Sequence, residues 1–402
     1  MKILILSFHY PPDLSAGSFR IEALVEQLSD NILEKGLIDI LTTSPHRYSQ
    51  FQIDGDGFVT NKNTSISRIN VYRPNGGVLS QSFTFLKYVN FVFRKTRHKD
   101  YDVIFATSSK LMTAVLGAYL SKKKKTPLYL DIRDLFADTI KDIYPGWRQW
   151  FLQPIFSNLE RWSFNKATHL NIVSGGFKAY VNEKTKTKNI SVHTNGIDEL
   201  FMSNFHKHKR FSKTIDQPYA NQKCKTILYA GNIGEGQGLD LIIPSMSQYL
   251  GENYLFKIIG DGRRLSILKK NISEANIKNV EFHPPVEREK LLREYELADI
   301  LFLHLNNNRA FDKVIPSKLF EFAATGKPIL AGVSGFSAKF IKDNIKNCEV
   351  FKPCDAELAI KAMKRLNLSY QNRQKFILQF QRKEIMKRMS SELIELVDKN
   401  KK

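Results

Sequence analysis

The sequence predicts two α/β domains of the Rossmann type, each built on a parallel sheet. Short continuous runs of apolar residues recur along the chain and alternate with stretches of helical periodicity. Such runs indicate parallel strands that are buried on both faces, because a half-exposed strand would alternate apolar and polar residues. The strand pattern restarts after about residue 220, and 402 residues are more than one core usually covers.

The predicted domains span residues 1–198 and 226–384, joined by a polar linker at 199–225 and followed by a basic helical stretch at 385–402. The strands expected in the first domain are Ile3–Ser7, Ile38–Thr42, Ser67–Tyr72, Val103–Ala106, Leu128–Ile132, Leu170–Val173 and Ser191–Thr194. Those expected in the second are Thr226–Ala230, Leu255–Ile259, Val280–Phe282, Ile300–His304, Pro328–Ala331 and Glu349–Phe351.

Composition limits the kind of protein. The apolar share of 42% is typical of a globular chain, and Cys224, Cys348 and Cys354 are too few for a disulfide framework, which indicates a reducing compartment. No run approaches the roughly 18 to 20 apolar residues that a membrane-spanning helix needs, and the first residues lack the apolar core of a signal peptide. We therefore expect a cytoplasmic protein.

The net charge of +21 predicts an anionic partner, either nucleic acid or a lipid surface. We favour lipid because residues 82–99, SFTFLKYVNFVFRKTRHK, interleave aromatic and basic side chains and contain no acid. The alternative is a helix that packs its Phe face into the core and leaves its basic ends in water. The residues predicted to face a membrane or an acceptor are Phe85, Lys87, Tyr88, Phe91, Arg94 and Lys95.

The most informative segment for function is residues 313–326, KVIPSKLFEFAATG. Pro316 suits the first turn of a helix, Ser317 can cap that helix, and Lys318 adds a positive charge at the same end. Free amides at a helix N-terminus bind phosphate, and Glu321 one turn further on can reach ribose hydroxyls. The spacing suits a nucleoside diphosphate; the alternative is an ordinary helix start with a glutamate on its buried face.

A glycine-containing loop follows the first strand of each half. In the first half, Gly17 precedes a helix that carries Arg20 on its first turn. In the second half, the loop YAGNIGEGQGLD contains Gly231, Gly234, Gly236 and Gly238. Both loops suit a phosphate. Neither has the spacing of a dinucleotide fingerprint or a P-loop, which counts against an NAD-linked oxidoreductase.

Taken in order, the segments PPDLSAGSFR, LDIRDLFAD, NGID, YAGNIGEGQGLD, IIGDGRR and VIPSKLFEFAATGKPIL resemble the retaining glycosyltransferase family 4 of the GT-B fold. The closest likeness is to bacterial L-fucosamine transferase-like proteins of surface-polysaccharide pathways. The resemblance covers nearly the whole chain and implies two Rossmann-like domains with parallel sheets facing a central cleft. It also implies that residues 385–402 pack back on the first domain.

The activity implied by this resemblance is transfer of a sugar from a UDP-sugar, with retention at the anomeric carbon. The implied acceptor is a polyprenyl-diphosphate-linked saccharide of O-antigen or capsule biosynthesis, at the anionic surface of the inner membrane. No cofactor and no nucleic acid partner are expected. A non-hydrolysing UDP-sugar epimerase, which shares the two-domain layout, and a non-catalytic basic nucleic-acid-binding protein are the alternatives.

By the same resemblance, Glu321 would hold the ribose and the amides of the Pro316–Lys318 turn would hold the diphosphate. A cation beside the leaving group would stabilise its charge, with Lys318 as first choice and Arg264 as second. The full predicted donor set is Gly17, Gly234, Gln237, Gly260, Gly262, Arg263, Arg264, Pro316, Ser317, Lys318 and Glu321. The residues predicted to take part in catalysis are Asp138, Lys318 and Glu321.

Two departures from the family pattern affect donor choice. The position eight residues before Glu321 holds Lys313 instead of the usual glutamate, so the donor sugar is left open. In the second glycine loop, Asn232 and Gln237 stand where many members have Arg and Lys, which raises the expected weight on Lys318.

An acidic cluster follows the fifth predicted strand of the first half, in LDIRDLFAD. Asp138 is expected to contact the acceptor or the reacting atoms, and the alternative is an internal salt-bridge network, of Arg133 with Asp134 or a neighbouring residue, that orients the loop.

No metal site is expected. Asp54 and Asp56 have a chelating spacing but suit a loop turn better, and His206 and His208 have no further ligands nearby.

Overall fold

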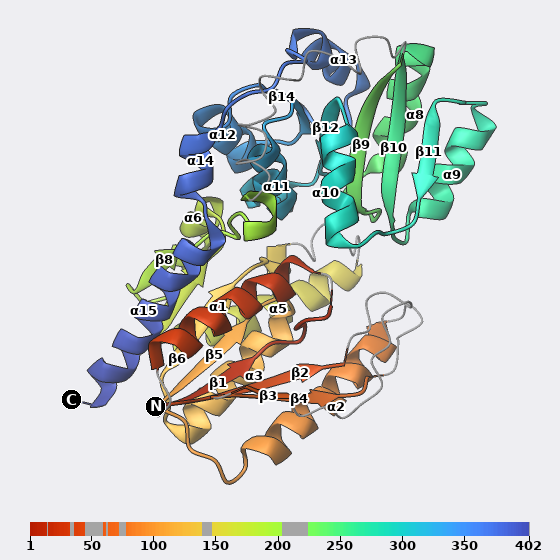
Figure 1. Cartoon of the computed structure of the whole chain (residues 1–402). Helices are drawn as coiled ribbons and strands as arrows, with labels where there is room; N and C mark the ends of the chain where they lie inside the picture. Colours follow the sequence, from red (N-terminus) through yellow and green to blue (C-terminus); the bar gives the residue numbers. More distant parts are fainter. Residues whose placement is uncertain are drawn as a thin grey trace. The chain divides into compact units, whose positions relative to one another are not determined.

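The computed structural model (Figure 1) describes most of the chain, over residues 1–13, 15–32, 36–44, 59–61, 63–71, 78–138, 147–202 and 224–401. The chain divides into two compact units. Unit 1 comprises Met1–Asn195 together with Arg382–Lys402, and unit 2 comprises Gly196–Gln381. The boundary falls at Gly196, whose φ of 69° lies in the left-handed region that favours glycine.

Unit 1 contains an eight-stranded sheet with the order β3-β4-β2-β1-β5-β6-β7-β8. Seven of these strands are parallel, and β3 pairs antiparallel with β4 at one edge. The bounds are β1 (Lys2–Leu6), β2 (Leu37–Thr43), β3 (Val59–Asn61), β4 (Thr64–Ile69), β5 (Val103–Thr107), β6 (Leu128–Ile132), β7 (His169–Ile172) and β8 (Ile190–Val192).

The edge of this sheet differs from the sequence prediction. The strand β3 was missed because three residues do not form a recognisable apolar run. The strand expected at Ser67–Tyr72 lies three residues earlier, at Thr64–Ile69. Its position is determined by hydrogen-bonded pairing with β2, and its apolar content does not determine it.

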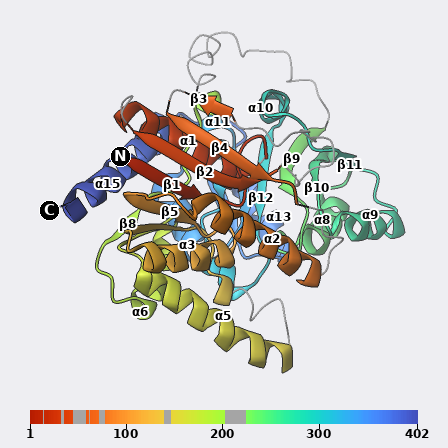
Figure 2. The same ribbon diagram turned by 90° about the horizontal axis from the view of Figure 1, so that it is seen from below.

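Two helices from opposite ends of the chain pack together on unit 1. Helices α1 and α15 contact each other and share a core with Ile3 and Ile5 of β1 (Figure 1). Figure 2 shows α3 and α5 side by side, and these two helices are also in contact. The helices of unit 1 are α1 (Ala16–Ile32), α2 (Val78–Thr96), α3 (Leu111–Lys124), α5 (Trp147–Lys166), η1 (Gly175–Phe177), α6 (Lys178–Lys184) and α15 (Arg382–Lys401).

Unit 2 contains a six-stranded parallel sheet with the order β11-β10-β9-β12-β13-β14. Its strands are β9 (Lys225–Asn232), β10 (Tyr254–Asp261), β11 (Val280–His283), β12 (Ile300–His304), β13 (Ile329–Gly332) and β14 (Cys348–Phe351). All six strands predicted for this half are confirmed within a few residues at their ends.

Helices cover both faces of the unit 2 sheet. Consecutive residues of β9 alternate between two cores: Leu228 packs with α10, α11, α12 and α14, whereas Ile227 packs with α8, α9 and α13. Strands buried on both faces explain the continuous apolar runs in the sequence. The helices are α8 (Leu239–Leu250), η2 (Gly251–Asn253), α9 (Leu265–Glu274), α10 (Arg288–Leu297), η3 (Arg309–Lys313), α11 (Ser317–Thr325), α12 (Gly335–Asn344), α13 (Ala356–Arg365) and α14 (Gln374–Gln379).

In an open parallel sheet, ligands bind at the carboxyl ends of the strands. In unit 2 that edge carries the loops after β9, β10 and β12, which contain most of the predicted donor residues. Among the described helices of the chain, none is long and apolar enough to cross a lipid bilayer.

Candidate functional site

The predicted nucleotide-binding turn begins helix α11, which follows the loop after β12. Pro316 is the N-cap residue and the helix begins at Ser317. The expectation that the Ser317 hydroxyl caps the helix is wrong, because Ser317 lies inside the first turn and no described side chain caps this end. A helix start without a side-chain cap keeps first-turn amides for another acceptor, such as a phosphate oxygen.

Glu321 lies one turn into α11 and is held by two donors. The Lys318 Nζ donates to Glu321 Oε2 at 2.9 Å and to the Tyr295 hydroxyl at 2.8 Å. The Tyr295 hydroxyl in turn donates to the same Oε2 at 3.0 Å. Burial, with the Glu321 charge beside it, raises the pKa of Tyr295 well above its usual value, so the hydroxyl stays protonated.

The Lys318 ammonium therefore lies against a carboxylate, although the sequence predicted that it would meet a pyrophosphate. Tyr295 is fully buried on α10, and its contact with Glu321 spans 26 residues of sequence. Sequence reasoning missed Tyr295 because it reads as one more buried residue of an amphipathic helix. No spacing rule links it to Glu321.

The glycine loop after β9 is ordered by its own side chains. Gln237 Oε1 accepts hydrogen bonds from Asn232 Nδ2 at 2.8 Å and from the Gly234 amide at 3.1 Å. The Asn306 amide donates to the Gly236 carbonyl at 2.8 Å, which joins this loop to the one after β12. Gln237, predicted to contact the donor, thus uses its amide oxygen to shape the loop.

His304, at the end of β12, fixes the same loop from below the surface. Its Nε2 accepts from the Cys354 amide at 3.0 Å, so Nδ1 carries the proton and donates to the Gln237 carbonyl at 2.6 Å. Burial lowers the pKa of His304 to about 4, and the ring is therefore neutral at physiological pH. The sequence gave no signal for this role, since His304 falls within a predicted apolar strand.

The end of β10 and the loop that follows it need glycine at two positions, because neighbouring backbone leaves no room for a Cβ. A Cβ on Gly260 would come within 1.9 Å of the Gly231 carbonyl oxygen, and one on Gly262 within 2.3 Å of the Ile233 oxygen. Arg264 forms an ion pair with the buried Asp240, whereas Arg263 is exposed. The second choice for a phosphate-binding cation is therefore already paired within unit 2.

In unit 1, the predicted acidic cluster separates into a buried pair and a surface group. Asp131 is fully buried and binds the fully buried Arg20 through two contacts of 3.0 Å. Burial alone would raise the pKa of Asp131, but the Arg20 guanidinium outweighs it and holds that pKa below its usual range. Asp131 thus forms a buried ion pair with Arg20, which the sequence did not predict, and the expected pairing of Arg133 with Asp134 stays a prediction. Asp138 is half-buried.

Gly17 lies beside Arg133 at the start of α1. A Cβ on Gly17 would come 3.8 Å from the Arg133 guanidinium carbon and 3.2 Å from the Ser109 hydroxyl. Burial lowers the pKa of Arg133 to about 10, and its Nη1 finds no hydrogen-bond partner among the described residues. Arg20, placed by sequence on the first turn of this helix, points into the core of unit 1 and not toward a ligand.

The aromatic face of α2 is in the core, which corrects the three aromatic residues among those predicted to face a membrane. Phe85, Tyr88 and Phe91 are at most 7% exposed, and the Tyr88 hydroxyl donates to the Leu41 carbonyl at 2.7 Å. The exposed apolar side chains of this helix are instead Phe83 and Leu86, at 62% and 59%. Lys87 and Arg94 are exposed, and Lys95 is half-buried.

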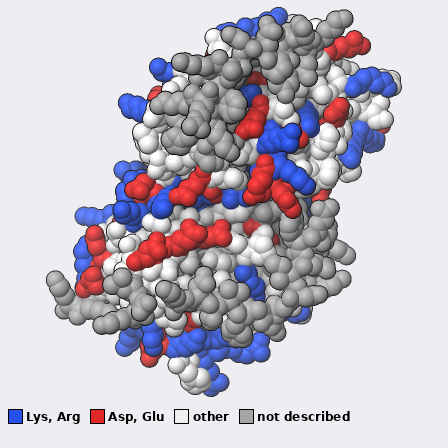
Figure 3. Space-filling model, in the orientation of Figure 1, with Lys and Arg blue, Asp and Glu red and all other residues white. Residues whose placement is uncertain are grey.

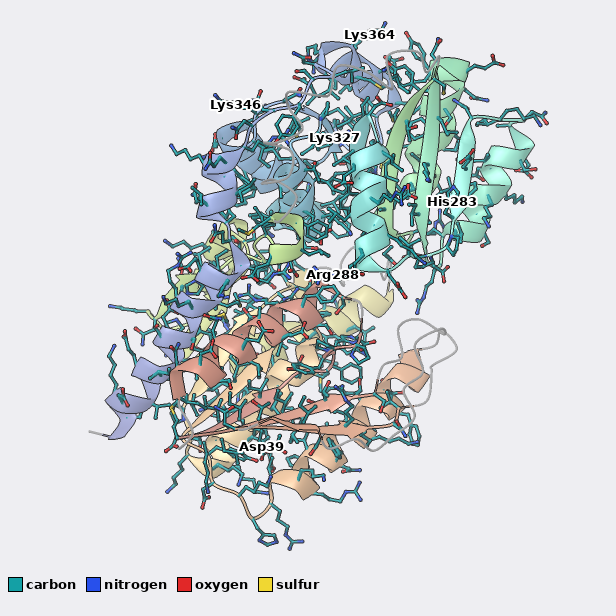
Figure 4. All side chains as sticks on the ribbon, viewed as in Figure 1. Asp39, His283, Arg288, Lys327, Lys346 and Lys364 are labelled. Carbon is teal, nitrogen blue, oxygen red and sulfur yellow. The ribbon has the colours of Figure 1, made fainter. Side chains whose placement is uncertain are left out.

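The last residue of the NGID segment, Asp198, forms an ion pair in unit 2. Asp198 binds Arg288, whose guanidinium also lies 5.6 Å from the centre of the Phe201 ring; Figure 4 labels Arg288 at the start of α10. The residues considered for metal binding, Asp54, Asp56, His206 and His208, lie outside the described part of the chain.

Two Rossmann-like units with parallel sheets define the class: the chain has the GT-B fold. Structural comparison supports this assignment. Sucrose-phosphate synthase from Thermosynechococcus elongatus aligns with a TM-score of 0.75 at 15% identity, over 98% of each chain. HepE of Anabaena, in complex with UDP-glucose, aligns with a TM-score of 0.66 at 15% identity, over 98% of this chain and 99% of HepE.

Sequence comparison points to one family. Residues 211–383 match the family model "Glycosyl transferases group 1", which identifies that domain in the second half of the chain. The Escherichia coli (strain K12) protein WcaI, whose assignment as a colanic acid biosynthesis glycosyl transferase is itself provisional, is 31% identical over 135 residues. That alignment covers 32% of this chain and only 33% of WcaI. None of these findings tests the narrower likeness to L-fucosamine transferases, which stays a prediction.

Proposed function

We propose that this protein is a retaining glycosyltransferase that moves a sugar from a UDP-sugar to a lipid-linked saccharide in polysaccharide biosynthesis. One observation carries the proposal: the start of α11 lacks a side-chain cap, and the Glu321 carboxylate lies one turn away in the same helix. This pair of features suits the diphosphate and the ribose of one nucleotide. The match of residues 211–383 to group 1 glycosyl transferases supports it, as does the fold shared with HepE, which was solved with UDP-glucose.

In the proposed reaction, the bond between the anomeric carbon and the phosphate oxygen of UDP breaks as the acceptor hydroxyl oxygen bonds to that carbon on the same face. The acceptor proton passes to the departing phosphate, and UDP leaves. The first-turn amides of α11 would stabilise the charge that develops on the phosphate. Arg263 is the exposed cation on the loop after β10 and is the candidate to add a positive charge.

The lipid-linked acceptor is supported by one surface of unit 1, here called the basic-aromatic surface. It combines outward residues of α2 and α3, which touch through Phe93 and Tyr119 at 5.5 Å between ring centres. Figure 3 shows Lys and Arg gathered along the lower edge of unit 1, where Figure 1 places the C-terminal part of α2. The exposed members are Phe83, Leu86, Lys87, Arg94, Tyr119, Lys122 and Lys123.

This surface fits an anionic bilayer better than a nucleic acid. Residues 78–99 and 103–130 contain no Asp or Glu, so nothing on these helices repels lipid phosphates. Phe83 and Leu86 are large, apolar and exposed, a combination that inserts into the headgroup region. We therefore propose that the protein acts at the inner face of a membrane, on a polyprenyl-diphosphate-linked acceptor.

The test is an assay with a panel of UDP-, GDP-, ADP- and dTDP-sugars, with and without a lipid fraction that carries polyprenyl-linked saccharides. We expect a glycosylated lipid with one UDP-sugar, only when the lipid is present, and thermal stabilisation by that donor. Conversion of the UDP-sugar without any acceptor would establish an epimerase instead. Binding to none of the nucleotides would remove the proposed function.

A further inference from the structure

The Glu321 carboxylate is held through only one of its two oxygens, and the proposed reaction does not explain this. Both donors, the Lys318 ammonium and the Tyr295 hydroxyl, reach the same carboxylate oxygen, Oε2. Among the described residues, no side chain or amide donates to the other oxygen, Oε1. The Glu321 carboxylate is thus fixed through one oxygen, and the second is left to accept from a ligand.

The three groups form a closed triangle of hydrogen bonds, with sides of 2.8, 2.9 and 3.0 Å. Tyr295 anchors the triangle because its side chain is fully buried and its ring makes an edge-to-face contact with Phe322, at 5.2 Å between ring centres. Lys318 and Glu321 retain side-chain exposures of 28% and 13%, so the carboxylate is held from the protein side and remains reachable from solvent.

The Lys318 ammonium has three N–H donors, and the triangle occupies two of them. To bind a pyrophosphate as its main role, it would have to leave two acceptors, one of them a partly buried carboxylate. That carboxylate would then be half-desolvated without its counter-ion, which is unfavourable. The geometry therefore favours a role in orienting Glu321 over a role in binding phosphate.

We propose that Lys318, together with Tyr295, is a positioning residue that orients Glu321 Oε1 toward the ribose diol, so that the site selects ribonucleotides over 2′-deoxyribonucleotides. This inference rests on the proposed function, because it takes the ligand to be a nucleotide. A fixed carboxylate accepts from the ribose hydroxyls without first losing rotational freedom. A carboxylate that rotates freely would lose most of that advantage.

The experiment measures dissociation constants by calorimetry for UDP, 2′-deoxy-UDP and uridine. A hydrogen bond from a hydroxyl to a charged acceptor predicts that the wild type binds UDP about 10-fold or more tightly than 2′-deoxy-UDP. In Lys318→Met we expect that ratio to fall to about 3 or less, while the ratio of UDP to uridine affinity stays within about 2-fold of wild type. Tyr295→Phe should reduce the ribose preference in the same direction, and Lys318→Arg should restore part of it.

Two matched variants make the result specific. Lys270→Met removes a lysine from an exposed ion pair with Glu274 on α9, and it should leave every ratio unchanged. Glu321→Gln should abolish the ribose preference, and adding Lys318→Met to it should cause no further loss. Additive losses in the double variant would overturn the proposal.

The outcomes separate this inference from the function on which it rests. If UDP binds and Lys318→Met keeps the full ribose preference, the positioning role is wrong and the nucleotide site stands. If Lys318→Met lowers the ratio of UDP to uridine affinity and spares the ribose preference, Lys318 binds the phosphates. If UDP does not bind the wild type, the nucleotide site and this inference fail together. A misfolded Lys318→Met is replaced by Tyr295→Phe, which keeps the ammonium and removes only the hydroxyl.

Discussion

The buried ion pair between Arg20 and Asp131 gives the sharpest stability prediction. Arg20 and Asp131 are both fully buried, 111 residues apart in sequence, and joined by two contacts of 3.0 Å. Arg20 also donates to the carbonyls of Thr194 at 2.6 Å and His193 at 2.9 Å. The substitution Arg20→Met removes these four hydrogen bonds and a longer one to Met389 Sδ at 3.5 Å. Among the described residues, it leaves the Asp131 carboxylate with a single side-chain donor, Asn171, at 2.6 Å.

Removing one partner of a buried ion pair typically costs about 3 to 5 kcal/mol, because the other charge stays buried without compensation. We expect Arg20→Met to lower the free energy of unfolding of unit 1 by that amount. The three tryptophans, Trp147, Trp150 and Trp162, all belong to α5 of unit 1, so tryptophan fluorescence in a urea titration reports this unit alone.

The control is the double variant Arg20→Met with Asp131→Leu, which removes both charges. Since replacing both partners by apolar groups costs far less than removing one, the double variant should be at least as stable as Arg20→Met alone. An Arg20→Met protein within about 1 kcal/mol of wild type would refute the reasoning. Fully additive costs in the double variant would refute it as well.

Three further predictions concern the pH dependence of unit 1, membrane binding by α2 and the packing of Gly262. Burial would raise the pKa of Glu392, but hydrogen bonds from His169 and His193 outweigh it and hold that pKa well below its usual range. Unit 1 should therefore lose stability as the pH falls below about 4, and this loss should be smaller in Glu392→Gln. The double variant Phe83→Ser with Leu86→Ser should bind anionic vesicles at least about 10-fold more weakly in a co-sedimentation assay, and its free energy of unfolding should be unchanged. Gly262→Ala should lower the thermal midpoint of unit 2 in circular dichroism and spare the tryptophan signal, because its Cβ would meet the Ile233 oxygen.

The first two of these predictions have a control at another residue of the same helix. Glu395→Gln alters an exposed glutamate on the same helix as Glu392 and should leave the pH dependence intact. Phe85→Ala empties a core position, so it should cost about 3 to 5 kcal/mol in unit 1, by a mechanism separate from membrane contact. Equal vesicle binding by the serine variant, or a normal melt of Gly262→Ala, would contradict the corresponding assignment.

Sequence patterns predicted the two sheets well because buried parallel strands have a simple signature. The run at Thr226–Ala230 can be recognised without knowing its partner strands, since its last four residues alternately face two helical layers. Strand β3 has no such signature, because its three residues are defined by their pairing with β4. Apolar runs therefore indicate the strands of both sheets, including the edge strands β11 and β14, but miss the short edge strand β3.

The candidate site was predicted in part because its backbone features are local in sequence and its side-chain partners are not. Pro316 next to Ser317 indicates the helix start directly, and the structure corrects only which residue is the cap. That Lys318 contacts Tyr295, and Arg20 contacts Asp131, depends on packing between distant segments. Similarly, the aromatic residues of α2 read alike in sequence, and only the fold separates the buried Phe85 from the exposed Phe83.

The discontinuity of unit 1 constrains the order in which the chain can fold during synthesis. Its core includes Ile385, Met386 and Met389 of α15, which the ribosome makes after all of Gly196–Gln381. Domains usually fold in order from the amino end of the chain. Here unit 2 is complete before unit 1, because the last residues of unit 1 are synthesised after unit 2. Until α15 is made, one apolar face of the earlier-made sheet is covered only in part, by α1. It is therefore the part of this protein most exposed to aggregation and to chaperones while translation continues.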